Sequence, residues 1–310
     1  MAIINEIPLS QWKVMAGLRM RQAMLLNGIL YNSEAWHGIS EKDISILEKV
    51  DEALLRKILA AHPKIPLEAL FLETMSIPIR YVLASRRILY LHAILQRDKN
   101  EMIRKVYDAQ KNNPSPGDFT ELVRKDCESI KLLLSDQEIS KLPRERFRNI
   151  VRMKISNASF AYLQKMQQGH SKMQNLKYEK FEMASYLNIP LFNDNSRSLL
   201  LSLRTRTVRG IRNDFRGLYS DISCPLGCGD IDTIENVLTC SVLKQYHRSI
   251  EVTESNIEFH DIFSQDIFKQ LKVTELYHQL LETRNKIIQS IPVAEITGPV
   301  HGCQAVQNLV

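Results

Sequence analysis

Three cysteines in the last third of the chain have a spacing suited to a metal ion. Cys224 and Cys228 flank a Pro-Leu-Gly turn, and Cys240 follows twelve residues later. Thiolates bind zinc well, and a turn of this length brings two of them to one ion. A closed zinc site needs a fourth ligand, for which His247 is the candidate. The sequence therefore predicts Zn²⁺ as a cofactor, and the alternative is a turn with three reduced cysteines.

Arginines are concentrated in residues 204–216, where they recur at spacings of two, three, three and four. This pattern predicts one helix that follows a cap at 193–196, extends to about Leu218 and presents the guanidinium groups on a broad shared face. A guanidinium donates two hydrogen bonds to a phosphate, so we expect phosphate contacts here. The alternative is a helix packed by its apolar residues, with its charges in water. The arginines concerned are Arg204, Arg206, Arg209, Arg212 and Arg216.

A second basic row lies in the predicted helix 144–168, where Arg144, Arg148 and Arg152 are one turn apart. Phe160 and Tyr162 follow and are able to stack on bases, as aromatic side chains do in single-strand grooves. The alternative for these two rings is a place in the core. We expect the three arginines to contact nucleic acid.

The elements that would position these residues are predicted to be helices. Hydrophobic residues make up 44% of the chain, and the 11 Gly and 11 Pro argue against long loops. Apolar residues recur every three to four positions after Ser40, and Ser40 with Asp43 is typical of a capping box, as is Ser135 with Glu138. We therefore expect an all-α fold. The predicted helices cover 12–37, 41–59, 66–74, 78–96, 99–112, 118–133, 144–168, 177–186, 258–271 and 273–289.

Charge is unevenly distributed along the chain. Residues 1–216 have a net charge of +12 and residues 217–310 a net charge of −6. A basic field attracts phosphate polymers, although a scattered, solvated basic surface is the alternative. No apolar run reaches the roughly 18 residues of a membrane span, and no secretory signal is visible. Five cysteines, an odd number, do not form a secreted disulfide framework, so we expect an intracellular protein, cytoplasmic or nuclear. We also expect no membrane partner and no small-molecule substrate.

Several segments resemble the region that follows the polymerase palm in non-LTR (LINE-like) retrotransposon reverse transcriptases. They are residues 17–36, 47–56 and 86–92. The stretch from Cys224 to Cys240 is similar to the family's C-terminal Cys/His knuckle, with Asn236 where the family has a histidine. The resemblance covers nearly the whole chain.

The resemblance implies a thumb and connector that grip template RNA and primer DNA. No Asp-Asp pair, the mark of the family's palm, occurs in the sequence, so we expect a C-terminal fragment that is not an enzyme and that binds RNA, DNA or a hybrid. A helical protein-interaction module and an inert pseudogene product are the alternatives. The expected domains are a thumb-like helical domain (1–113), a basic helical connector (118–218), a degenerate zinc-knuckle-like unit (219–247), two C-terminal helices (248–290) and an irregular tail (291–310).

Overall fold

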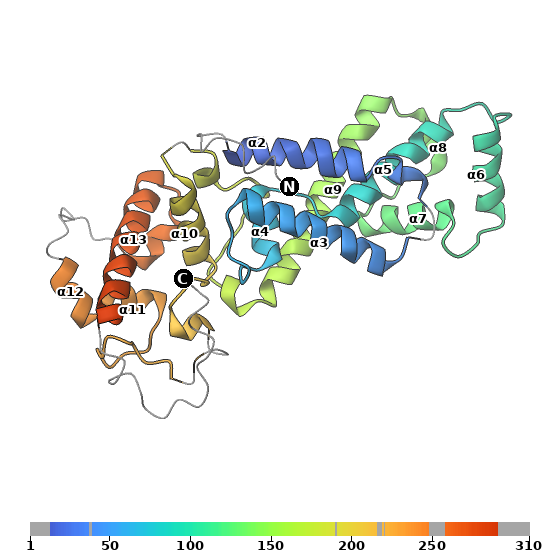
Figure 1. The fold of residues 1–310 in the computed structure, drawn as a ribbon. Coiled ribbons are helices and arrows are strands. Elements are labelled where there is room, and N and C mark those ends of the chain that lie inside the picture. Colours follow the sequence, from blue (N-terminus) through green and yellow to red (C-terminus); the bar gives the residue numbers. More distant parts are fainter. Residues whose placement is uncertain are drawn as a thin grey trace. The chain divides into compact units, whose positions relative to one another are not determined.

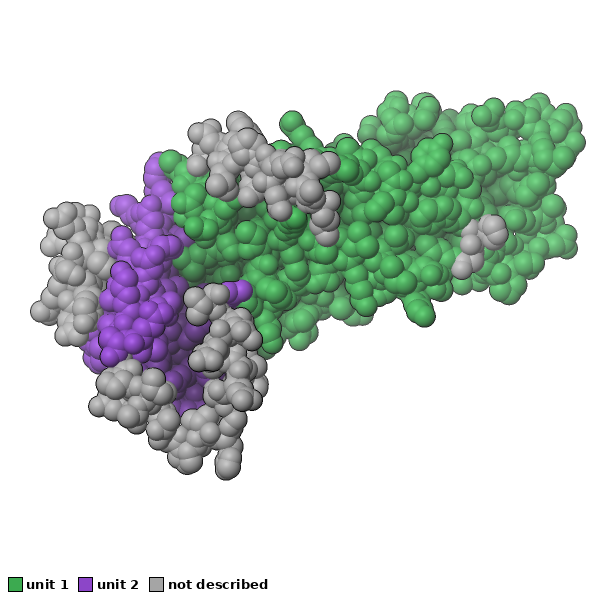
Figure 2. Space-filling model, viewed as in Figure 1, with its two compact units in different colours: residues 1–205 green, residues 206–310 purple. Residues whose placement is uncertain are grey.

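The fold is all-α in the residues that the computed structural model describes, as the sequence predicts (Figure 1). These residues are 13–36, 39–189, 191–215, 219, 221–247 and 258–290. Within them, extended pairing is limited to one antiparallel bridge between Ser223 and Ile231. None of their helices combines the length and the apolar composition needed to cross a bilayer. The chain divides into two compact units, residues 1–205 and 206–310 (Figure 2).

The first described helix of unit 1 changes its hydrogen-bonding pattern partway along. α2 (Lys13–Met20) continues into the π-helix η1 (Arg21–Ile29), and the 3₁₀ helix η2 (Ser33–Ala35) follows. The carbonyl groups at the end of a helix have no partner within it. Arg86 supplies one here, because its guanidinium donates hydrogen bonds to the carbonyl groups of Leu26 and Leu30.

The next three helices begin where the sequence predicts. α3 (Glu41–Ile58) has the expected capping box, in which Ser40 Oγ accepts a hydrogen bond from the Asp43 N–H and the Asp43 carboxylate accepts one from the Ser40 N–H. α4 (Leu67–Thr74) and α5 (Ile79–Leu95) each follow a proline at the N-cap. Proline is tolerated at a helix start because the first backbone N–H groups of a helix have no intrahelical acceptor, so the N–H that proline lacks is not missed.

α5 is the central helix of the larger core of unit 1. Around it lie α6 (Met102–Asn112), α7 (Phe119–Ser129), α8 (Asp136–Lys141) and α9 (Arg144–Gln168). α8 has the predicted capping box between Ser135 and Glu138. α9 has the predicted bounds, and every fourth side chain along it is buried, which fastens it to the core. The buried row is Phe147, Val151, Ile155, Ser159 and Leu163.

The predicted helix over 177–186 was wrong. After the short η3 (Ser171–Met173), the chain is irregular as far as η4 (Ser185–Leu187). Glutamine side chains of α9 hold this loop: Gln164 Nε2 donates to the Tyr178 carbonyl at 3.0 Å, and Gln167 Nε2 donates to the Leu176 carbonyl at 2.5 Å. The loop satisfies its backbone through these side chains rather than through helical hydrogen bonds.

Unit 2 is built on one long helix. α13 (Ile267–Ser290) is preceded by η6 (Phe259–Phe263) and contacts α11 (Ile234–Thr239) and α12 (Ser241–His247). The predicted break between helices 258–271 and 273–289 is therefore misplaced. Val273 and Tyr277 are buried on one side of α13, so the helix crosses the predicted break with its packing intact.

Candidate functional site

The turn that contains Cys224 and Cys228 is closed by backbone hydrogen bonds. The Cys224 N–H donates to the Asp230 carbonyl at 2.8 Å, and the Gly227 N–H donates to the Cys224 carbonyl at 3.0 Å. Gly227 and Gly229 have φ values of +75° and +90°, which glycine adopts without the steric cost of a Cβ atom. The turn therefore places both cysteines at the same point of unit 2.

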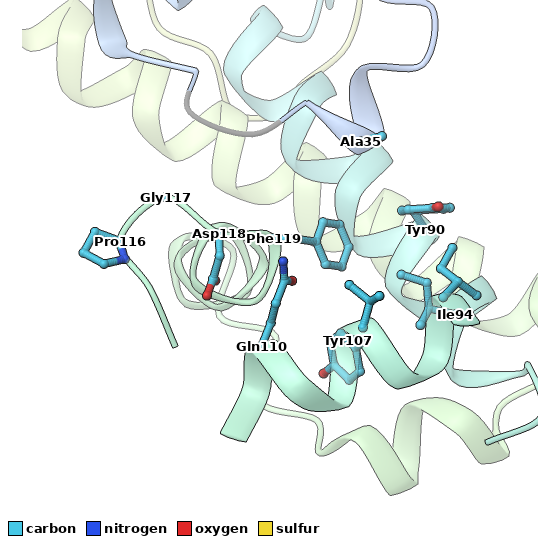
Figure 3. Close-up of a pocket in the computed structure, with 11 residues that line it drawn as sticks. Ala35, Tyr90, Ile94, Tyr107, Gln110, Pro116, Gly117, Asp118 and Phe119 are labelled. Carbon is cyan, nitrogen blue, oxygen red and sulfur yellow. The ribbon is translucent and has the colours of Figure 1, made fainter. Parts of the chain in front are cut away.

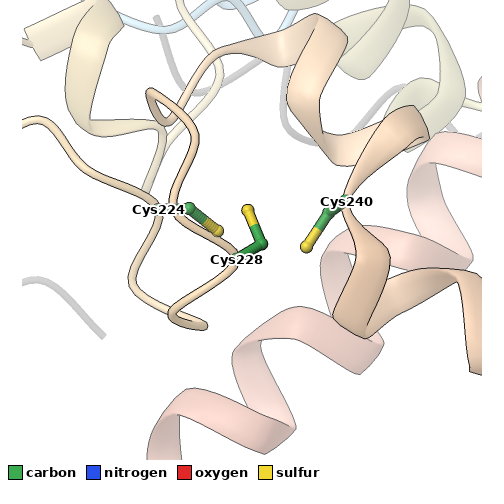
Figure 4. Close-up of side chains that lie close together, drawn as sticks. All are labelled: Cys224, Cys228 and Cys240. Carbon is green, nitrogen blue, oxygen red and sulfur yellow. The ribbon is translucent and has the colours of Figure 1, made fainter.

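The third cysteine is delivered by a short helix. Thr233 caps α11 by accepting a hydrogen bond from the Asn236 N–H at 3.0 Å. Cys240 directly follows α11, and its N–H donates to the Asn236 carbonyl at 2.7 Å. This brings Cys240 to the turn, as Figure 4 shows, and the sulfur atoms of the three cysteines lie within 4.8 Å of one another. The three cysteines are thus placed to hold a metal ion.

The spacing of the three sulfur atoms fits a tetrahedral ion. Zn–S bonds of about 2.3 Å place two sulfur ligands about 3.8 Å apart, so small side-chain rotations suffice to close the site. Burial raises the pKa of Cys224 to about 12. At Cys228 burial acts in the same direction, but hydrogen bonds from the Asp230 N–H and from Asn236 outweigh it and lower the pKa. A metal ion would displace the remaining thiol protons, because thiolates are its ligands.

The residue at position 236 lies against this cluster. Asn236 is buried, and its Nδ2 is 3.6 Å from Cys228 Sγ and 3.3 Å from an Asp230 carboxylate oxygen. An amide is a poor zinc ligand, so Asn236 itself does not complete a strong site. The other proposed ligand, His247, ends α12, but its side chain lies outside the described residues.

A buried ion pair connects the segment between Cys228 and Cys240 to α13. Arg284 Nη2 of α13 donates to both carboxylate oxygens of Asp232, at 2.7 and 2.9 Å, and the two side chains are 2% and 1% exposed. The same carboxylate accepts the Arg212 N–H at 2.7 Å. Asp232, which lies between Cys228 and Cys240, is therefore connected to α13 through Arg284 and to the preceding segment through Arg212.

The predicted helix to Leu218 was wrong. α10 (Asp194–Arg204) ends at the first of the clustered arginines. Arg206 and Gly210 then have φ values of +50° and +82°, and among the described residues from 205 to 215 the one further helical segment is the 3₁₀ helix η5 (Arg212–Phe215). Left-handed residues interrupt a helix, so no single helical face joins these arginines.

Most of these arginines are also engaged by carboxylates. Arg204 donates to buried Glu73 at 2.9 Å. Arg206 pairs with Glu235, and Arg212 pairs with exposed Asp221 at 3.2 Å. The physical reason is tertiary: carboxylates that the fold brings beside these arginines neutralise charges that the sequence alone leaves open to phosphate. Arg209 is exposed, and Arg216 lies outside the described residues.

The row on α9 has a different character. Arg144, Arg148 and Arg152 are all exposed. Arg148 and Arg152 each follow a residue of the buried row by one position, which is about 100° around the helix, and Arg144 lies one turn before Arg148. Arg148 has an ion pair with Glu145 at 2.8 Å, but both side chains are largely exposed. Such a pair contributes little and yields readily to another anion.

The two rings that follow on α9 are partly buried and each contacts another aromatic side chain. Phe160 stacks on Phe181 with ring centroids 5.6 Å apart. Tyr162 meets Tyr81 edge-on at 5.8 Å and lies under the guanidinium of Arg80. Both rings are thus in contact with other side chains, which agrees with the structural alternative rather than with base stacking.

A cavity of about 450 Å³ lies between α5, α6 and α7 (Figure 3). Its walls include Tyr90, Ile94, Tyr107 and Phe119. The carboxylate at its edge, Asp118, caps α7 by accepting hydrogen bonds from the N–H groups of Ser115 at 2.7 Å and Glu121 at 2.8 Å. The carboxylate is committed to this cap, so the chemistry that the cavity offers is apolar contact.

Comparison with known protein families, with curated proteins and with solved structures gives no match for this chain.

Proposed function

We propose that this chain binds nucleic acid without catalysing a reaction on it, and that it is a C-terminal fragment of a non-LTR retrotransposon reverse transcriptase. The observation that carries the binding proposal is the exposed row of Arg144, Arg148 and Arg152 on α9. The helix places the Cα atoms of the three arginines about 6 Å apart along its axis. A rigid row of this kind suits a phosphate backbone, which arginine recognises through paired hydrogen bonds.

The charge around this row supports the proposal. α9 carries six Lys or Arg residues and one acidic residue, Glu145. The other exposed side chains near the row are those of Arg146, Asn149 and Met153, none of which is acidic. A positive field of this kind attracts duplexes and hybrids through their backbones, so we expect binding without sequence preference. The segment resemblances support the family assignment.

The cysteine cluster belongs to the same proposal as a structural zinc site. Three thiolates at this spacing favour Zn²⁺ over hard cations, which prefer oxygen ligands. The ion would fasten the turn at Cys224 and Cys228 to α11 through Cys240. Its role is to hold unit 2 together rather than to supply chemistry.

The test of the binding proposal is a salt titration. Affinity for duplex DNA and for an RNA–DNA hybrid is measured against salt with the full chain and with Arg144, Arg148 and Arg152 all replaced by alanine. Each phosphate that an arginine no longer neutralises should reduce the log–log slope on DNA by about 0.9, so the slope of the variant should fall by up to about three units. A matched control replaces Arg97, Lys105 and Arg124, which changes the net charge equally away from α9. Equal slopes for the two variants would contradict the proposal.

One observation favours a protein-interaction module as the second candidate. α6 exposes Met102 and Val106, at 76% and 47%, beside the apolar cavity. Exposed apolar side chains next to such a cavity are typical of protein contacts. Partners that remain bound to the full chain after nuclease treatment, and that no longer bind after Met102→Asp with Val106→Asp, would support this function.

A further inference from the structure

The cysteine cluster has a carboxylate at its edge that neither the turn nor the core requires. An Asp230 carboxylate oxygen is 3.8 Å from Cys228 Sγ. The backbone carbonyl of Asp230 accepts the Cys224 N–H at 2.8 Å, so the main chain of Asp230 lies directly beside that cysteine. We propose that Asp230 is the fourth ligand of the metal ion, giving a site of three thiolates and one carboxylate. This inference rests on the proposed zinc site.

The distance between Asp230 and Cys228 fits two ligands of one ion. With Zn–S bonds of about 2.3 Å and a Zn–O bond of about 2.0 to 2.2 Å, sulfur and oxygen ligands are about 3.6 Å apart in a tetrahedron. The observed 3.8 Å between Asp230 and Cys228 is close to this value. Approach to the other two sulfur atoms would come from rotation of the Asp230 side chain, which is exposed.

Asn236 then has a role that its poor affinity for metal does not suggest. Its Nδ2 lies 3.3 Å from the same Asp230 oxygen and 3.6 Å from Cys228 Sγ, so the amide donates toward both ligands. Outer-shell hydrogen bonds of this kind orient a ligand and are a regular part of metal sites. Asn236, at the position where the resembled family has a histidine ligand, thus orients the carboxylate of Asp230, which takes the place of that histidine as a ligand.

Competing ligands are less suitable among the described residues. Asp232, two positions on, is committed to Arg284 and to the Arg212 N–H. The amide oxygen of Asn236 is neutral and 3.9 Å from Cys228 Sγ. Three thiolates and one carboxylate bring four negative charges to Zn²⁺, the same number as the common four-cysteine site.

The test uses Co²⁺ as a spectroscopic probe for the full chain with reduced, metal-free thiols. Wild type should bind Co²⁺ with the visible absorption of a tetrahedral site. Asp230→Asn should weaken this binding roughly tenfold to a hundredfold and alter the spectrum, because it removes a charged ligand. Adding Asn236→His to that variant should restore the affinity. Glu275→Gln, an equal charge change at an exposed position of α13, should leave both affinity and spectrum unchanged.

A second variant, Asp230→Cys, places a sulfur at the same point and should increase the thiolate-to-cobalt charge-transfer absorption by about a third, in proportion to sulfur ligands. It keeps the inference testable if Asp230→Asn has reduced helix content by circular dichroism. Wild-type affinity in Asp230→Asn, or no added charge-transfer intensity in Asp230→Cys, overturns the assignment of Asp230 alone. If wild type does not bind Co²⁺, the proposed zinc site fails, and the assignment fails with it.

Discussion

Arg204 and Glu73, 131 residues apart in the sequence, form a buried ion pair in which Arg204 Nε donates to Glu73 Oε1 at 2.9 Å. The glutamate side chain is fully buried, and the hydroxyl of Tyr178 donates to the same oxygen at 2.7 Å. Burial, with the nearby Glu73 charge, raises the pKa of Tyr178 well above its usual range, so this hydroxyl keeps its proton. The pair fastens the end of α10 and the loop after α9 to α4.

Replacing Arg204 by alanine should therefore affect folding rather than nucleic-acid binding. The change leaves the Glu73 carboxylate buried without its counter-charge, which typically costs about 3 to 5 kcal/mol of unfolding free energy. Arg209→Ala, at an exposed position, should change stability by less than about 0.5 kcal/mol. Urea unfolding of both variants gives the comparison, and equal midpoints would contradict the structural role of Arg204.

The limits of the sequence prediction are visible at this pair. Spacing places Arg204 on a helix with the arginines that follow, but it contains no information about a carboxylate contributed by α4. Only the folded chain reveals that Arg204, Arg206 and Arg212 each have an acidic neighbour. Among the described residues, the ion pair of the α9 row is the nearby one between Arg148 and Glu145, so the helix and its exposed face follow from the local pattern.

The local signals were reliable for a physical reason. The capping boxes at Ser40 and Ser135 and the turn at Cys224 involve residues within a few positions, whose geometry the sequence nearly determines. The convergence of Cys240 was predictable from spacing alone. The contact of Asp230 with Asn236 was not, because it depends on how α11 packs over the turn.

Acid should weaken two helix starts. A hydrogen bond from the Ser40 side chain lowers the pKa of Asp43, and one from the Ser135 N–H lowers that of Glu138. A pKa lower in the folded state gives stability that is present above the unfolded pKa and is lost as pH falls through the folded one. Melting temperatures of wild type and of Asp43→Asn with Glu138→Gln should therefore differ at neutral pH, and the difference should shrink as the pH falls from about 4 through the lower pKa values of the folded state. A difference in melting temperature that persists in acid would contradict the stabilisation of these helix starts by the two carboxylates.

The ion pair between Arg284 and Asp232 should influence metal binding although neither side chain is a proposed ligand. Arg284→Met leaves Asp232 without its main partner, and that carboxylate also holds the Arg212 N–H. The turn between Asp232 and Cys224 should become less ordered, so Co²⁺ affinity should fall several-fold without a change in the absorption bands of the bound ion. The control Lys272→Met removes a charge of the same helix that has no part in this pair and should leave affinity unchanged. A shifted spectrum in Arg284→Met would mean that the ligand set itself had changed.

Metal removal should loosen unit 2 selectively. A bound ion stabilises the folded state by an amount that grows with its concentration relative to Kd, about 2.7 kcal/mol at roughly a hundredfold excess. The three cysteines connect the turn to α11, so a chelator should increase amide hydrogen exchange in residues 224–240. Exchange in α5 and α9, whose core lies in unit 1, should stay constant, and added Zn²⁺ should restore the original pattern. Cys127→Ser, which alters a cysteine outside the cluster, should respond to chelator as wild type does. Exchange that chelator leaves unchanged throughout unit 2 would show that the cluster does not hold a structural ion.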